Sequence, residues 1–107
     1  MKYEITTSAR ADFGRLSDAD RATARAALAA FATACGAHAD PAGIEVPRSL
    51  RVKPVQGAPG VFEMTWSFSG PDGRATFEWG TVVNADGATE PLVRWRRIGD
   101  HKIFKRP

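Results

Sequence analysis

The sequence predicts a two-layer α+β domain in which two helices cover one face of an antiparallel sheet. Apolar residues recur at helical spacing before residue 36, they alternate with polar residues after residue 61, and a short alternating segment opens the chain. An N-terminal strand followed by two helices must return to the sheet to bury its apolar side. A length of 107 residues suits one hydrophobic core. Residues 1–107 are therefore expected to form a single domain.

The first alternating segment, residues 2–6, predicts a half-buried strand with Tyr3 and Ile5 on one side. A short amphipathic helix follows, for which Thr7 or Ser8 offers the N-cap. This helix is brief because its apolar spacing ends within three turns.

A second, alanine-rich helix begins at Ser17, and Asp20 completes an approximate capping box. Gly36 is its expected C-cap, and residues 36–49, with proline and glycine, predict an irregular connection. The two helices are joined with almost no linker and are expected to form an antiparallel hairpin. Four residues share one apolar stripe of the second helix: Ala24, Leu28, Phe31 and Cys35.

The C-terminal half changes to the period of two that is typical of strands. Residues 62–68 and 74–79 alternate, with turn residues between them, and predict a β-hairpin. A turn near residues 84–87 precedes a third strand from about residue 92 to residue 98, so the expected sheet contains a three-stranded antiparallel meander. Residues 52–55 offer a short extension before the hairpin. Three tryptophans fall on the inward side and are expected in the core: Trp66, Trp79 and Trp95.

Charge is distributed unevenly along the chain, whose formal net charge is +3, because residues 48–107 carry ten Lys/Arg against six Asp/Glu. The sheet face that the helices leave open is expected to collect charged and hydroxyl side chains: Glu63, Thr65, Arg74, Thr76, Glu78, Arg94 and Arg96. One interpretation is a set of solvated cross-strand ion pairs. The other is an anion site, in which converging guanidinium groups bind phosphate.

The few sulfur and imidazole ligands limit the chemistry. A single cysteine excludes an intramolecular disulfide, and two histidines, His38 and His101, without a cysteine cluster argue against a zinc site. Neither a membrane-spanning helix nor a secretion signal is visible. We therefore expect a cytoplasmic protein with no metal and no cofactor.

Five segments, in this order, carry a resemblance to a known family: KYEI, DFGRL, LRVKPVQGAPGVFEM, SGPDGRATFEW and RWRRIGDHKIF. The third segment holds a Leu/Lys–Gly–Gly lead-in, the fourth an arginine that opens the middle strand, and the last an Ile-Gly-x-basic-x-x-aromatic pattern. Together they resemble the RelE/ParE superfamily of bacterial type II toxins over nearly the whole chain.

The resemblance implies a RelE-like toxin fold and the activity of a ribosome-dependent mRNA endonuclease that inhibits translation. In such enzymes the 2′-hydroxyl of the RNA attacks the adjacent phosphate, which leaves a cyclic phosphate and a free 5′-hydroxyl. That step requires a proton acceptor, cations at the non-bridging oxygens and a proton donor for the leaving oxygen.

Four residues are expected to be catalytic, three of them through this resemblance and Glu63 by its geometry. Arg74 matches the arginine of the family's middle strand and would contact the phosphate. His101 matches the basic or histidine position of the closing motif, as general acid or base, or is a surface histidine of a basic tail. Lys53 matches a family lysine and either holds phosphate or is a surface charge, and Glu63 is a candidate base or a cross-strand partner of Arg74.

Five further residues are expected to bind RNA: Arg94, Arg96, Arg97, Lys102 and Phe104. Which of the two adjacent arginines faces the substrate depends on the strand register. Phe104 stands where RelE-like enzymes often have tyrosine. Phenylalanine can stack on a base but cannot transfer a proton, which leaves open a degenerate member that only binds.

The resemblance also implies partners, namely a cognate antitoxin in a hetero-oligomer with the toxin, and the ribosome with its mRNA. No membrane is expected among them. The alternative within the superfamily is a ParE-like inhibitor of DNA gyrase that is not an enzyme. Arg74 together with His101 favours the nuclease, because ParE-like chains generally lack such a pair.

Overall fold

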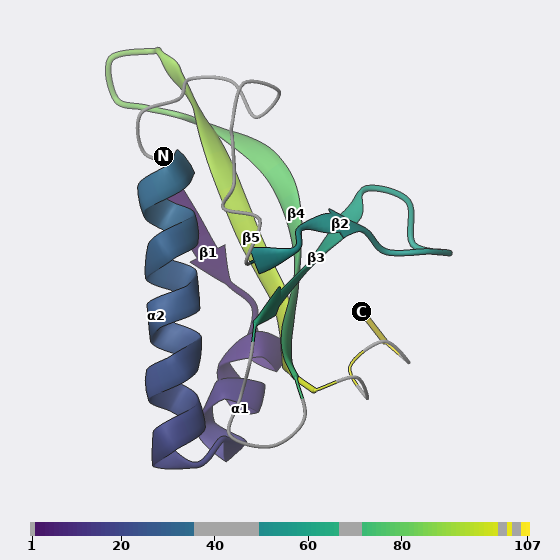
Figure 1. The fold of residues 1–107 in the computed structure, drawn as a ribbon. Coiled ribbons are helices and arrows are strands. Elements are labelled where there is room, and N and C mark those ends of the chain that lie inside the picture. The colour runs from purple at the N-terminus through teal and green to yellow at the C-terminus, as the bar shows by residue number, and fades with distance from the viewer. Residues whose placement is uncertain (1, 36–49, 67–71, 101–102, 104–105) are drawn as a thin grey trace.

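The computed structural model describes residues 2–35, 50–66, 72–100, 103 and 106–107. Over these residues the chain forms two helices and a five-stranded mixed sheet, so the predicted α+β class is confirmed (Figure 1). The elements follow one another as β1 (Lys2–Ile5), α1 (Thr7–Arg15), α2 (Asp18–Cys35), β2 (Lys53–Pro54), β3 (Val61–Trp66), β4 (Gly73–Val83) and β5 (Thr89–Gly99).

The strands lie in the order β1-β5-β4-β3-β2, with β1 parallel to β5 and the other neighbours antiparallel. The expected meander of three antiparallel strands is one strand short. Lys53 and Pro54 pair with Glu63 and Phe62 and form the additional strand β2. Two residues are too few to show alternation in a sequence. Proline is tolerated in β2 because this strand is the edge of the sheet.

Local capping explains where the helices begin. Thr6, not Thr7 or Ser8, is the N-cap of α1, since its side chain accepts a hydrogen bond from the backbone N–H of Ala9. The expected cap of α2 is confirmed, because the N–H of Asp20 donates to Oγ of Ser17 at 3.1 Å. The predicted Gly36 cap lies outside the described residues.

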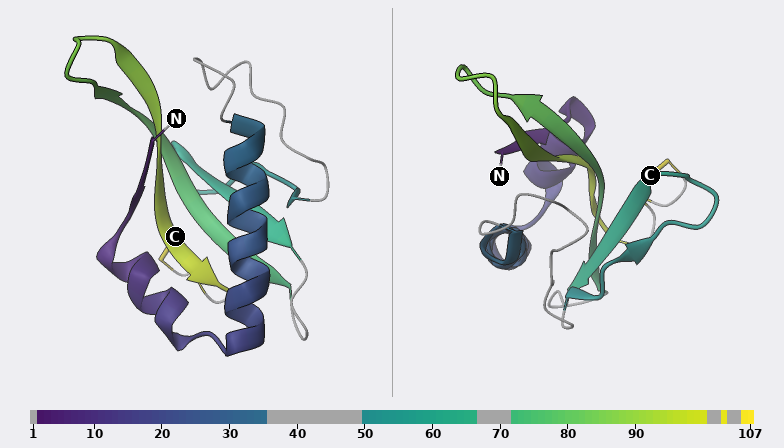
Figure 2. Two further views of the ribbon diagram at one scale, coloured as in Figure 1. Left: turned by 90° about the vertical axis from the view of Figure 1, so that its left-hand side faces the viewer. Right: turned by 90° about the horizontal axis from the view of Figure 1, so that it is seen from above.

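The core lies between α2 and one face of the sheet (Figures 1 and 2). Phe31 of α2 packs against Phe77 and Trp95, with ring centroids 5.0 and 5.2 Å apart. Trp66 and Trp95 are buried and Trp79 packs against the same cluster, so the inward assignment of the tryptophans is confirmed.

The two helices do not lie side by side along their length, as the expected antiparallel hairpin would. They open as a V from their junction (Figure 2, left). The helix α2 covers the sheet face, whereas α1 packs against β5. The short junction shows only that the helices follow one another in the chain. Their separate contacts with the sheet set the angle between them.

The first strand is less buried than its alternation predicts. Tyr3 is 68% exposed and Ile5 is 36% exposed. Because β1 is the outermost strand next to β5, the helix α2 does not cover its apolar side. Both side chains instead line an open groove of about 290 Å³ together with Leu28 and Ala32 of α2.

A bulge in β5 decides the direction of two arginines. Phe77 pairs with Trp95 and Thr76 pairs with Arg97, so Arg96 has no register partner on β4. Trp95 and Ile98 both remain buried on the side of α2. The bulge thus places Arg96 and Arg97 together on the opposite face, which the period of two could not predict.

That opposite face is not open along its whole width, as had been expected. Thr76 is fully buried, and Thr65 and Glu63 are 2% and 6% exposed. The hydroxyl of Thr76 donates to the backbone oxygen of Pro107 at 3.0 Å, so residues 106–107 lie against this face, opposite to α2 (Figure 1). Contacts with residues so remote in sequence are not visible in a local pattern.

A buried carboxylate attaches α1 to β5. Asp12 accepts two hydrogen bonds from Arg97, at 2.6 and 3.1 Å, and one from Arg15 at 3.1 Å. It also accepts the backbone N–H of Ile98 at 3.1 Å. Just before α1, the backbone N–H of Thr6 donates to the backbone oxygen of Trp95, and its hydroxyl donates to that of Arg96. The helix α1 therefore continues the edge pairing that β1 begins.

We expect Asp12→Ala to lower the free energy of unfolding by about 3 kcal/mol, because it leaves Arg97 and a strand N–H without their acceptor. The measurement is urea unfolding followed by circular dichroism. The matched control is Asp18→Ala, which removes a 96% exposed partner of Arg21 and should cost less than about 1 kcal/mol. Equal losses in the two variants would contradict the anchoring role of Asp12.

Candidate functional site

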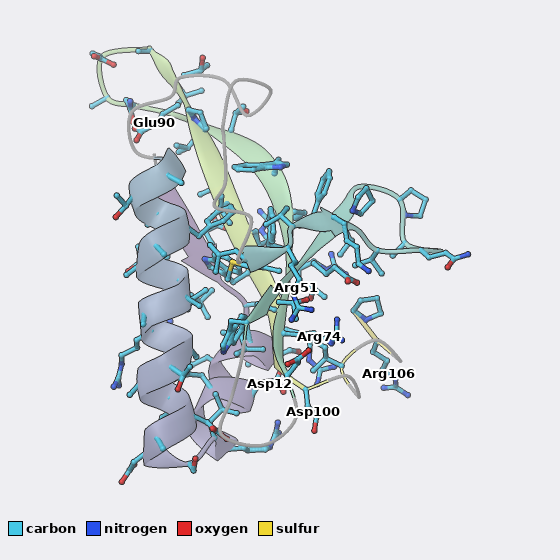
Figure 3. The ribbon with its side chains drawn as sticks, in the orientation of Figure 1. Asp12, Arg51, Arg74, Glu90, Asp100 and Arg106 are labelled. Carbon is cyan, nitrogen blue, oxygen red and sulfur yellow. The ribbon has the colours of Figure 1, made fainter. Side chains whose placement is uncertain are left out.

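The candidate site is the sheet face that points away from α2, which we call the charged face. Its outward side chains on β3, β4 and β5 are Glu63, Thr65, Arg74, Thr76, Glu78, Arg94, Arg96 and Arg97. Figure 3 shows Arg74, Asp100 and Arg106 on the side of the sheet away from α2. Three groups of charged side chains lie on or beside this face.

The first group, the Arg74 cluster, consists of Lys53, Glu63, Thr65 and Arg74. Oε1 of Glu63 lies 3.4 Å from Nζ of Lys53 and 3.7 Å from Nη1 of Arg74. Nη1 of Arg74 also donates to Oγ1 of Thr65 at 3.2 Å. Three of the four residues predicted to be catalytic are thus brought together, from β2, β3 and β4.

The positions within this cluster favour different roles. The side chain of Lys53 is 66% exposed, so it can reach a ligand, whereas that of Glu63 is 9% exposed. A carboxylate held between two cations beneath the surface fits the cross-strand partner of the sequence interpretation better than a base that meets a substrate hydroxyl. Glu63 therefore positions Lys53 and Arg74.

The end of β5 lies beside Arg74. In the register Arg74 pairs with Gly99, and the chain leaves the sheet at Asp100. The buried side chain of Ile103 then folds back over Gly99, where a Cβ atom would meet its Cγ2 at 2.9 Å. The predicted site residues His101, Lys102 and Phe104 lie outside the described residues.

The second group joins Arg94 and Arg96 to carboxylates. Arg94 donates to Glu4 of β1 at 2.9 Å and to Glu78 at 2.8 Å, and Arg96 donates to Glu78 at 3.2 Å. The hydrogen bond from Arg94 holds the pKa of Glu78 below its ordinary value, and the charge of Arg96 adds to this effect. Glu4 and Glu78 together raise the pKa of Arg94.

The third group surrounds Asp12. The hydrogen bonds that Asp12 accepts from Arg97 raise the pKa of Arg97. Arg97 also donates to the backbone oxygen of Arg106 at 3.1 Å. Sequence reasoning missed Asp12, Arg15 and Arg106, because a carboxylate within a short helix carries no sign of a partner 85 residues away. The only available signal was its place on the apolar side of the helix, one residue before Phe13.

Both sequence interpretations of the charged face thus describe part of it. Arg94 and Arg96 form cross-strand ion pairs, as the interpretation of solvated pairs expects, whereas Arg97 pairs with the buried Asp12 of α1. Lys53 and Arg74 both lie against Glu63, and Arg74 is next to the chain that leaves β5. Two adjacent cations of this kind can stabilise a phosphate oxygen in a transition state. Within the described ranges no three His, Cys, Asp or Glu side chains are placed to hold a metal ion.

Comparisons of this chain with known protein families, with curated proteins and with solved structures found no match. Neither α1 nor α2, the helices in the described part of the chain, is long and apolar enough to cross a membrane.

Glu78→Gln is expected to reduce the acid sensitivity of the fold. Because the native pKa of Glu78 is lowered, its ion pairs stabilise the protein above about pH 4.5 and this contribution is lost as the pH falls through the native pKa. The variant should be less stable at neutral pH and should lose less stability on acidification. Urea unfolding over that pH range measures both. A pH dependence equal to that of the wild type would contradict the assignment.

Gly99→Ala tests the close packing at the end of β5. The added methyl group must displace Ile103, so we expect a loss of about 1–3 kcal/mol in the free energy of unfolding. Gly14→Ala in α1 is the control, because no atom lies within 4 Å of the new Cβ and alanine favours a helix by up to about 1 kcal/mol. A neutral Gly99→Ala would show that Ile103 does not pack tightly on this strand.

Proposed function

We propose that this protein is the toxin of a type II toxin–antitoxin system and cleaves mRNA on the translating ribosome. The observation that carries the proposal is the Arg74 cluster, in which Arg74 and Lys53 approach the same oxygen of Glu63 and Arg74 pairs with the end of β5. The RelE-like topology belongs to the same proposal. It is supported by the order of strand, two helices and antiparallel strands, with β1 returning beside β5.

The proposed reaction is a transesterification within the RNA. The 2′-oxygen forms a bond to the adjacent phosphorus while the bond to the 5′-oxygen breaks, which leaves a 2′,3′-cyclic phosphate and a 5′-hydroxyl. The proton of the 2′-hydroxyl passes to a base, and the leaving oxygen receives a proton from an acid. His101, which follows Asp100 by one residue, serves as one of these two groups, the general acid or the general base, and water exchanges the other proton.

The cations have a separate role. Charge develops on the non-bridging oxygens as the phosphorus becomes five-coordinate, and Arg74 and Lys53 stabilise it. Arg74 is fixed by Thr65 and Glu63, so its guanidinium group is oriented before the substrate binds. Lys53 is exposed and adapts to the bound RNA.

The proposal includes a cytoplasmic location and a cognate antitoxin that binds and inhibits the toxin. The excess of basic residues in the second half of the chain supports an acidic or amphipathic antitoxin segment as the inhibitor.

We expect Arg74→Ala to lower the rate of mRNA cleavage about 100- to 1,000-fold while the protein stays folded, because it removes a donor to the transition state. Cleavage is measured by primer extension on mRNA in a reconstituted translation system. Arg21→Ala, on α2 and remote from the charged face, is the matched control and should cleave as the wild type does. His101→Ala should lose cleavage to a similar extent.

Three results would contradict the proposal. Intact mRNA with a block of gyrase supercoiling would show the ParE-like inhibitor instead. Intact mRNA and active gyrase, with tight binding to an antitoxin, would show the degenerate member that Phe104 leaves open. Unchanged cleavage in both Arg74→Ala and His101→Ala would remove these residues from the site.

A further inference from the structure

A second concave site lies at the edge of the charged face, between α1, the bulged part of β5 and residues 106–107. It is an open cavity of about 520 Å³, within the range of roughly 300–1,000 Å³ that is usual for ligand sites. Its basic lining residues are Arg15 of α1, Arg96 and Arg97 of β5, and Arg106. We call it the arginine cavity.

The charge of this cavity favours an anion. Four arginines line the cavity, and two carboxylates pair with them. The buried Asp12 is saturated by Arg97, Arg15 and the N–H of Ile98, and Glu78 pairs with Arg96. Four cations against two carboxylates leave this region with an excess of positive charge.

Three of the arginines are exposed enough for their N–H groups to reach a ligand. The side chain of Arg15 is 72% exposed, that of Arg96 is 39% exposed, and Arg106 is exposed as well. Arg96 and Arg97 already donate to the backbone oxygens of Pro107 and Arg106, at 3.0 and 3.1 Å. Their guanidinium groups are thus aimed at oxygen acceptors on this side of the sheet.

Neutral donors complete the lining. The hydroxyl-bearing residues Thr6, Thr7 and Ser8 border the cavity, and they form the start of α1, where the helix dipole is positive. Donors therefore converge from a helix, a strand and the C-terminal segment. A tetrahedral phosphate accepts hydrogen bonds from several directions, as donors placed on three different segments require.

The arginine cavity lies on the same side of the sheet as the Arg74 cluster. Arg97 pairs with Thr76, which lies two residues from Arg74 on the same face of β4. Two residues along a strand span about 7 Å, which is the scale of the step between successive phosphates in a nucleic-acid strand. An RNA strand that places its scissile phosphate at Arg74 can therefore place a neighbouring phosphate toward this cavity.

We propose that the arginine cavity binds the phosphodiester backbone of single-stranded RNA next to the scissile phosphate, through Arg15, Arg96 and Arg106. This inference rests on the proposed function for the identity of the ligand, but its test requires no cleavage. Arg97 is a positioning residue here, because its hydrogen bonds go to Asp12 of α1 and to the backbone of Arg106, the segments that border the cavity.

The test measures the affinity of the full chain for a fluorescent single-stranded RNA that carries 2′-O-methyl groups and cannot be cleaved. Fluorescence anisotropy is recorded as a function of salt concentration. The double variant Arg15→Gln/Arg106→Gln should bind more weakly, and its plot of log K against log salt should be shallower by about 0.7 for each lost phosphate contact. Both residues are exposed, so circular dichroism should show an intact fold.

The matched control is Arg10→Gln/Arg21→Gln, which makes the same change in charge with residues that do not line the cavity. It should leave the slope close to that of the wild type. Equal slopes for the wild type and the Arg15→Gln/Arg106→Gln variant would overturn the proposal. So would an equal loss in both double variants, since the effect would then follow net charge alone.

Two competitors identify the ligand class. Displacement of the RNA by an unlabelled 2′-O-methyl RNA, with much weaker displacement by pyrophosphate, supports a phosphodiester site. Pyrophosphate that binds more tightly than the RNA would show a site for a small phosphate compound, and an Asp/Glu-rich peptide that binds more tightly would show a protein docking site. Either result overturns the RNA assignment. Because the 2′-O-methyl RNA cannot be cleaved, an RNA affinity that depends on Arg15 and Arg106 can hold even if the proposed cleavage is not found.

Discussion

The arrangement of this protein depends on the fork between Asp12 and Arg97. A helix of nine residues is too short to be stable alone, so α1 needs a strong tertiary contact. Asp12 provides it by bonding the guanidinium group of Arg97 and the N–H of Ile98, which would otherwise be an unpaired donor at the edge of β5. One carboxylate thus fixes the helix, terminates the edge pairing begun by β1 and orients an arginine toward the charged face.

The bulge at Arg96 makes this arrangement possible. Without the extra residue, Arg97 and Trp95 would share a face and one of them would have to enter the wrong environment. With it, Trp95 and Ile98 both stay in the core while two consecutive arginines point away from α2. The charged face and the arginine cavity are therefore consequences of one local irregularity in β5, combined with a helix that anchors its edge.

The sequence analysis succeeded where the determinants are local. Neighbours in the chain determine the cap at Ser17 and the inward direction of the tryptophans. They also determine that Arg74 and Phe77 lie on opposite faces of β4. It was wrong about the strand count, the helical hairpin and the openness of the polar face. Each of these depends on a remote segment, namely β3 for Lys53 and Pro54, the sheet for the helix angle, and Pro107 for the burial of Thr76. The resemblance to RelE-like toxins stays a proposal, as do the roles that it gives to His101, Lys102 and Phe104.

By itself, the sequence determined the class of fold, much of the core and three of the cations on one side of the sheet, Arg74, Arg94 and Arg96. These properties come from periodicity, and periodicity is set within a few residues. Only the tertiary structure decided which charges are neutralised and which are available. Glu63 lies between Lys53 and Arg74, and Asp12 saturates Arg97, whereas Arg15 and Arg106 remain exposed. The electrostatic character of a side chain depends on its neighbours in space, and strand register, a bulge and the path of the last residues choose those neighbours.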